Sequence, residues 1–324
     1  MSPHSSAPSH RAGVATMVPS ATDLVVALGG ADRIVGTSHE CDHPAVTGRP
    51  VLTRSALASA PEPGRAAADP AALDAEVAAA RDADAPLYLT DRDALHRLAP
   101  GVVVAQDVCD VCAVTGDQVA CDVPPDTDVV RLGAVDLAGL ATDLRSVGQA
   151  LGGDAPSRAE AEVAAIGREL DAVRRAVAGR GRPRVLLLEW GDPPFIAGHW
   201  LPELLDVAGG EDALARPGDP SRRTTWEELA EADPDVVVFL PCGYDLAGAV
   251  AEGTALLART EVAGLRAVAD GRVWATDATR LFSRCTPVVR TAARVLASIL
   301  HPEAVGPPDP ADAALLGVAR GNPS

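Results

Sequence analysis

Five residues whose side chains could bind a metal or act as nucleophiles lie in two short stretches. They are His39, Glu40 and Cys41 within "TSHECDHP", and Cys109 and Cys112 within "QDVCDVCAV". Thiolates and imidazoles are good ligands for zinc, iron or the cobalt of a corrinoid, and Cys-x-x-Cys is a common spacing for half of a zinc site. A closed zinc site needs four ligands, so these residues form one only if the two stretches meet in the fold.

Three interpretations of the cysteines remain open at this point. In the first, Cys41, Cys109 and Cys112 are ligands of a metal or of a metal cofactor, and His39 or a cysteine approaches the metal of a bound ligand. In the second they are small residues packed at a turn, because unpaired cysteine is among the most buried residue types. In the third they form a thiol redox centre.

The aromatic residues form a second group. The chain has four tryptophans, two tyrosines and three phenylalanines, and five of these rings follow predicted strands in its second half. Those five are Trp190, Phe195, Trp200, Tyr244 and Phe282. Core packing is the alternative, but we favour contact with a flat or conjugated ligand because loops carry them. His199, beside Trp200, is either a second ligand contact or a solvated loop histidine.

Short β-branched runs alternate with helical patterns along the chain, which predicts parallel sheets covered by helices. The expected strands are 14–18, 33–36, 86–90, 102–106, 128–132, 184–190, 235–240 and 272–276. The fold class is therefore α/β, with two doubly wound lobes joined by one long rigid helix. Because ligands bind beyond the carboxyl ends of parallel strands, the residues described above should gather at those ends.

The long helix is predicted over 157–179. Its apolar residues recur at steps of three and four, Ser157 and Glu160 form a capping-box pattern at its start, and Gly179 ends it. With a second helix over 136–151 it should brace the two lobes. The expected organisation is an N-terminal lobe over 13–135, a helical brace over 136–182, a C-terminal lobe over 183–302 and a peripheral tail over 303–324.

Composition excludes several classes of function. A formal charge of −17 in 324 residues makes nucleic acid and anionic membranes poor partners. All 28 basic residues are arginine, which rules out a Walker-type phosphate loop and a lysine Schiff base. No apolar stretch suggests a signal peptide or a membrane span. We therefore expect a cytoplasmic monomer, or a periplasmic or cell-surface one if the start is mis-assigned.

Five stretches resemble the periplasmic-binding-protein superfamily for cobalamin, haem and ferric siderophores, and most of all its cobalamin-binding-like subgroup. They are "VPSATDLVVALGGADRIVGTSHECDHP", "VLTRSAL", "LYLTDRDALHRLAPGVVVAQDVCDVCAV", "LLEWGDPPFIAGHWLPELLDVAGGED" and "VWATDATRLFSR". The resemblance covers residues 13–301. The proline-serine turn is common to the superfamily, whereas the pairing of His-Glu-Cys-Asp with Gln-x-x-Cys-x-x-Cys-Ala is far more specific.

This resemblance implies a non-catalytic protein that holds a corrinoid such as cobalamin, or another metal chelate, between its lobes and delivers it to an ABC permease. The expected ligand-binding residues are Pro19, Ser20, His39, Glu40, Trp190, Phe195, His199, Trp200, Tyr244, Phe282 and Arg284, with Cys41, Cys109 and Cys112 as metal ligands. The alternative is a cytoplasmic enzyme or metal-handling protein that uses zinc, iron or a thiol and has reused the fold.

Overall fold

The computed structural model describes residues 13–60, 69–108 and 114–317, so Cys109 and Cys112 lie outside the described residues. Within these ranges the backbone forms two compact units. The first unit contains residues 13–56, 84–133 and 143–160, and the second contains 57–83, 134–142 and 161–317. Residues 57–83 therefore group with the second unit, although they fall inside the predicted N-terminal lobe.

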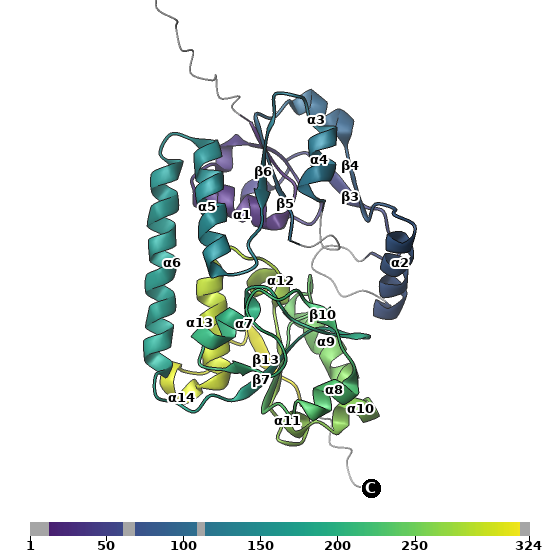
Figure 1. Cartoon of the computed structure of the whole chain (residues 1–324), viewed down its shortest axis with the longest axis vertical. Coiled ribbons are helices and arrows are strands. Elements are labelled where there is room, and N and C mark those ends of the chain that lie inside the picture. Colours follow the sequence, from purple (N-terminus) through teal and green to yellow (C-terminus); the bar gives the residue numbers. More distant parts are fainter. Residues whose placement is uncertain (1–12, 61–68, 109–113, 318–324) are drawn as a thin grey trace, which may run out of the picture. The chain divides into compact units, whose positions relative to one another are not determined.

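The first unit is built on a four-stranded parallel sheet with the order β2-β1-β5-β6. Two of its strands, β5 and β6, are labelled in Figure 1. Its strands are β1 (Val14–Thr16), β2 (Ile34–Thr37), β5 (Val102–Gln106) and β6 (Asp128–Leu132), as the sequence predicted. Every residue of β1 and β5 is buried, which suits central strands covered by helices on both faces. The helices of this unit are α1 (Pro19–Ala27), α3 (Arg92–Leu98) and α4 (Gly116–Asp122).

The predicted strand at 86–90 differs from this expectation in its pairing. It forms β4 (Tyr88–Thr90), which pairs antiparallel with β3 (Thr53–Ser55) in a separate two-stranded sheet, and Thr53 lies opposite Thr90. Two short 3₁₀ turns, η1 (Ala31–Arg33) and η2 (Pro44–Val46), flank β2. No strand was predicted at β3, because three residues are too few to establish a period.

The second unit is built on a seven-stranded sheet with the order β10-β8-β7-β11-β12-β13, and β9 also pairs with β7. The strands are β7 (Arg184–Gly191), β8 (Pro194–Ile196), β9 (Glu211–Asp212), β10 (Arg222–Arg223), β11 (Val236–Phe239), β12 (Val273–Thr276) and β13 (Ala313–Leu315). The parallel pairs join β9, β7, β11 and β12, whereas β8, β10 and β13 are antiparallel to their neighbours.

The tail does not behave as predicted. We expected residues 303–324 to be peripheral, but β13 continues the sheet beyond β12, and Leu316 is 4% exposed against the core. The apolar run at 313–316 is short, yet pairing with an edge strand satisfies its backbone groups and buries one side chain.

The second unit also contains several helices. They are α2 (Pro70–Asp82), α7 (Leu201–Val207), α8 (Trp226–Glu231), α9 (Leu246–Leu257), α10 (Thr260–Ala263), α11 (Arg266–Ala269), α12 (Ala278–Leu281), α13 (Val289–Leu300) and α14 (Pro302–Val305). Several begin at a side-chain cap: Asp69, Thr225, Asp245 and Asp277 each accept a hydrogen bond from a backbone N–H of the first turn. These caps fix where the loops end and the helices begin.

Two long helices, α5 (Leu137–Leu151) and α6 (Ala155–Val177), follow β6. They confirm the predicted helices, but the predicted capping box is wrong. Because α6 begins at Ala155, Ser157 lies inside the helix, and the Glu160 carboxylate accepts two hydrogen bonds from Arg145 of α5, at 2.7 and 2.9 Å. The pattern therefore serves packing between the helices, not the start of one.

In both sheets the strand order reverses next to the first strand of the unit, β1 in the first and β7 in the second. In the first unit the chain runs from β1 to β2 on one side and returns to β5 on the other. In the second unit it runs from β7 to β9 and returns to β11. In open parallel sheets such reversal points open a crevice at the carboxyl ends of the two central strands, and ligands bind there. The structure thus marks the ends of β1 and β5, and separately those of β7 and β11.

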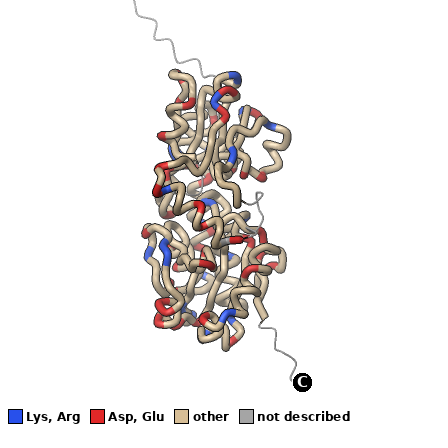
Figure 2. The backbone as a smooth tube through the Cα atoms, turned by 90° about the vertical axis from the view of Figure 1, so that its right-hand side faces the viewer, with Lys and Arg blue, Asp and Glu red and all other residues tan. Residues whose placement is uncertain are grey.

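Acidic and basic residues are interspersed along the backbone of both units (Figure 2). Many arginines are paired with carboxylates, such as Arg266 with Asp233 and Asp235. Across the described residues, none of the helices combines the length and the apolar composition needed to span a membrane.

Candidate functional site

The carboxyl end of β1 carries the predicted proline-serine turn. Pro19 is buried and is the first residue of α1, a favoured position because proline lacks the N–H that would be unpaired there. Ser20 is half-buried in the same first turn. The structure therefore places both residues at the reversal point of the first sheet, as predicted, and their contact with a ligand stays a prediction.

His39 lies in the loop that follows β2. Its backbone N–H donates to Thr53 Oγ1 at 3.0 Å, its Nδ1 lies 2.8 Å from the same oxygen, and its ring centroid is 5.8 Å from that of Tyr88. Partial burial lowers the pKa of His39, which keeps the imidazole neutral at pH 7. In the tautomer in which Nδ1 donates to Thr53, the neutral ring presents the lone pair of Nε2 to a metal. Glu40, the next residue, is half-buried.

Cys41 belongs to a cluster of small polar side chains. Its Sγ donates to Thr22 Oγ1 at 3.2 Å, and that oxygen lies 2.7 Å from Thr16 Oγ1 and 3.5 Å from Thr37 Oγ1. The three threonines are buried, and sequence reasoning missed them because isolated threonines in strands carry no functional signal. The part of the chain that the structure describes contains no group of three metal-binding side chains, so a site completed by Cys109 and Cys112 stays a prediction.

A polar groove of about 420 Å³ adjoins the residue that holds His39. It runs along β3, β4 and the first turn of α3. Its lining residues are Val51, Leu52, Thr53, Arg54, Leu89, Thr90, Asp91, Arg92 and Asp93. The Asp91 carboxylate is engaged, since it accepts the N–H of Ala94 at 2.8 Å as the cap of α3.

In the second unit Trp190 lies within β7 and Phe195 within β8, so strands and not the expected loop carry these two aromatic residues. The β7–β8 connection sets Trp190 directly opposite Phe195, and a β-bulge between Leu188 and Trp190 produces that register. Bulges redirect side chains beside functional sites because they interrupt the alternation of the strand. Both rings are half-buried, and the Trp190 Nε1 donates to Asp192 O at 3.2 Å. The register therefore places two half-buried aromatic residues opposite each other at the end of β7, and we call this pair the aromatic surface, although Trp190 also packs against the core of the unit.

Arg223, which sequence reasoning missed, extends this surface by one strand. It lies opposite Phe195 in the β8–β10 pairing, and its guanidinium carbon is 5.5 Å from the centroid of the Phe195 ring. Its Nη2 also donates to both carboxylate oxygens of Asp74 on α2, at 2.8 and 2.7 Å. We call these three residues of β7, β8 and β10 the Trp190–Phe195–Arg223 row. Only the strand register reveals it.

Two predicted residues, Tyr244 and Phe282, do not line the surface. Their side chains are 1% and 2% exposed, so the expectation of direct ligand contact is corrected for them. A buried ring offers no area to a ligand, and the loops that carry these residues fold back onto the core. Tyr244 instead packs edge-to-face against Trp190, with ring centroids 5.6 Å apart and an interplanar angle of 77°. Arg284 is half-buried in the loop after α12.

His199 and Trp200 lie just before α7. Their rings stack at 6.0 Å, and His199 has a positive φ of 53° that is held by hydrogen bonds with Asp219 O at 2.6 Å and Gly218 N at 2.9 Å. Partial burial lowers the pKa of His199, and its contact with a ligand stays a prediction. The Trp200 Nε1 is buried and, among the described residues, has no hydrogen-bond partner.

A buried carboxylate, Glu252 of α9, lies beneath the end of β7. A Cβ on Gly191 would come within 3.0 Å of Glu252 Oε1 and 2.5 Å of Leu256, which explains the glycine at this position. Burial raises the pKa of Glu252, the hydrogen bond with Tyr244 opposes this rise, and the charge of Asp192 adds to it. Sequence reasoning did not single out this residue, since an isolated glutamate in a helix is normally exposed.

The chain matches a known protein family over most of its length. The model of the periplasmic binding protein family matches residues 14–279, which is most of the chain. This family supplies the substrate-binding components of ABC transporters and is not a family of enzymes. No curated protein matches the sequence.

Solved structures agree with this match. A periplasmic haem-binding protein from Pseudomonas aeruginosa is 23% identical with a TM-score of 0.65, covering 94% of this chain and 99% of that chain. A periplasmic vitamin B12-binding protein of Vibrio cholerae is 17% identical with a TM-score of 0.62, covering 89% and 96%. An ABC transporter substrate-binding protein from Listeria monocytogenes EGD-e is 16% identical with a TM-score of 0.64, covering 90% and 99%. These similarities confirm the α/β fold with parallel sheets.

One expectation is overturned by these findings. We expected a cytoplasmic protein, but the matching family and its solved neighbours are periplasmic binding proteins. The expectation was wrong because it rested on the first residues of the sequence, whereas the family match rests on the folded part of the chain.

Proposed function

Because the chain belongs to the family of periplasmic binding proteins, we propose that it binds a metal chelate with a flat macrocycle, such as a cobalamin-like corrinoid or haem. The observation that carries this proposal is the aromatic surface of Trp190 and Phe195 at the end of β7. Aromatic side chains can stack on a conjugated macrocycle, because the side-chain rings and the macrocycle are both flat and apolar. Two solved neighbours are a haem-binding and a vitamin B12-binding protein, which supports the same class of ligand.

In the first unit, His39 supports the same proposal. Its neutral, oriented imidazole is suited to approach the metal of a chelate, as expected from the sequence. The cysteines at 41, 109 and 112 are the further candidates for that contact. We further propose that the protein is a monomer, that it delivers its ligand to an ABC permease and that it catalyses no reaction.

Equilibrium dialysis tests this proposal with three probes: cyanocobalamin, haemin and a ferric hydroxamate siderophore. We expect saturable binding of one molecule per chain for cyanocobalamin or haemin, with a shifted visible absorbance band, and no saturable binding of the siderophore, which has no flat macrocycle. Quenching of tryptophan fluorescence gives a second readout. If neither macrocycle binds saturably, or if only the siderophore does, the proposal is wrong.

Two variants locate the binding surface. Trp190→Leu should weaken binding about five- to tenfold, because an aromatic contact contributes roughly 1 kcal/mol beyond its buried area. Trp274→Leu is the matched control, since Trp274 lies within β12 and away from the strand-end loops. Equal losses of affinity in both variants would place the ligand elsewhere.

A further inference from the structure

The Trp190–Phe195–Arg223 row combines two apolar rings with one cation. Directly opposed residues of antiparallel strands project to the same face, so Arg223 borders the face on which Phe195 lies. The distance of 5.5 Å from the guanidinium carbon to the ring centroid fits a cation–π contact. The guanidinium therefore stands at the edge of the aromatic surface and has a preferred orientation.

Part of this guanidinium is still able to bind a ligand. Asp74 occupies Nη2, and its carboxylate is 24% exposed. Within the described part of the chain, Nε and Nη1 of Arg223 make no hydrogen bond, and the side chain is 54% exposed. A guanidinium anchored at one nitrogen loses less freedom when another of its donors forms a charge-assisted hydrogen bond with a carboxylate.

The charged groups next to Arg223 are already paired with other side chains. Arg222, the preceding residue, lies opposite Ile196 and holds Glu228 through both of its terminal nitrogens. The Asp192 carboxylate at the β7–β8 turn is paired with Arg259 at 2.8 Å. Arg223 is thus the arginine of β10 whose donors remain open beside the rings.

We propose that Arg223 determines ligand specificity by binding a carboxylate at the periphery of the macrocycle that rests on Trp190 and Phe195. The ligand class is then a flat metal chelate with free carboxylates, as opposed to one whose side chains are all amides. This inference rests on the proposed function and narrows it.

Binding of haemin, which has two carboxylates, is compared with that of haemin dimethyl ester, which has none, and with cyanocobalamin. Dissociation constants are measured for the unmodified protein, Arg223→Gln and Arg222→Gln. We expect Arg223→Gln to weaken haemin binding about fivefold, the size typical of a partly exposed charge-assisted contact, and to leave the ester unaffected. Arg222→Gln removes the same charge one residue away, and it should change neither the affinity for haemin nor the affinity for the ester. Arg223→Lys should restore part of the affinity for haemin.

The outcomes separate this inference from the proposed function. Equal weakening of haemin and its ester by Arg223→Gln, or an equal effect of Arg222→Gln, overturns the role of Arg223. Binding of cyanocobalamin without haemin supports the proposed function but overturns the carboxylate specificity. If none of these probes binds, or if only the siderophore binds, both the proposed function and the role of Arg223 are wrong.

Discussion

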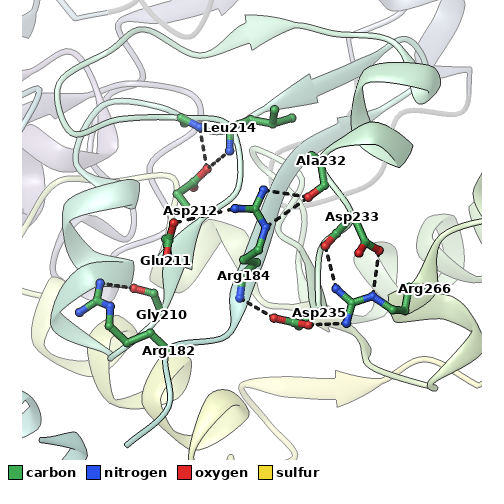
Figure 3. A network of polar contacts seen from close by, with 11 residues as sticks. Arg182, Arg184, Gly210, Glu211, Asp212, Leu214, Ala232, Asp233, Asp235 and Arg266 are labelled. Atoms are coloured by element: carbon green, nitrogen blue, oxygen red, sulfur yellow. Dashed lines mark hydrogen bonds and ion pairs between the residues drawn. The ribbon is translucent and has the colours of Figure 1, made fainter. Parts of the chain in front are cut away.

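Asp212 is a half-buried acid whose ionisation should oppose folding of the second unit. It lies on β9, where its Oδ1 accepts the N–H groups of Leu214 and Ala215 at 2.9 and 2.7 Å (Figure 3). Its Oδ2 is buried and has no partner among the described residues. The nearby Arg184 is directed to Ala232 O instead. Burial therefore raises the pKa of Asp212 to about 6, although the two backbone hydrogen bonds oppose this rise.

The sign of the effect follows from proton binding. The folded state holds the proton up to about pH 6, whereas the unfolded chain releases it near the ordinary value of 3.8. Stability from this proton is fully present below pH 3.8 and is lost as the pH rises through about 6. The whole difference is about 3 kcal/mol, and about 1.3 kcal/mol of it falls between pH 5 and pH 7.

The substitution Asp212→Asn removes this titration. Its amide oxygen can still accept the two backbone hydrogen bonds, while its amide nitrogen adds a cost of about 1–3 kcal/mol that does not vary with pH. Urea unfolding at pH 5, 6 and 7 should therefore show the unmodified protein losing about 1.3 kcal/mol more than the variant. Tryptophan fluorescence is the right probe, because all four tryptophans lie in the second unit.

The control is Glu211→Gln, which removes one negative charge from the exposed neighbour on the same strand. It should leave the pH dependence of the unmodified protein intact. If Asp212→Asn and the unmodified protein lose stability in parallel between pH 5 and 7, the carboxyl group is not buried as described and the reasoning is refuted.

Two further substitutions test local packing. Gly198→Ala should lower the unfolding free energy by about 1–3 kcal/mol, because its Cβ would lie 2.3 Å from the backbone atom Asp219 O. Gly264→Ala is the control and should be neutral in the same urea titration, because the nearest atom to its Cβ is Glu261 O at 3.9 Å. Thr22→Val should destabilise the first unit by about 1–3 kcal/mol, because it leaves the buried Thr16 hydroxyl without its 2.7 Å partner. Circular dichroism follows this loss, and Thr22→Ser should retain most of the stability.

Much of the fold was predictable from local patterns. The central strands and α6 are long or strongly periodic, so the burial they require is written into neighbouring residues. The same patterns predicted which loops follow the strands, and hence that Pro19, His39 and Trp190 lie at strand ends. Short elements such as β3, β9 and β13 escaped prediction because two or three residues carry no period.

The sequence by itself determined the fold class, the family resemblance and the residues that lie at the strand ends. Only the tertiary structure decided which of those side chains are exposed, burying Tyr244 and Phe282 and leaving Trp190 and Phe195 half-buried. It also decided that Arg223 meets Asp74, 149 residues away in the chain. The physical reason is that burial and cross-strand register depend on contacts between distant segments, which no local pattern of residues encodes.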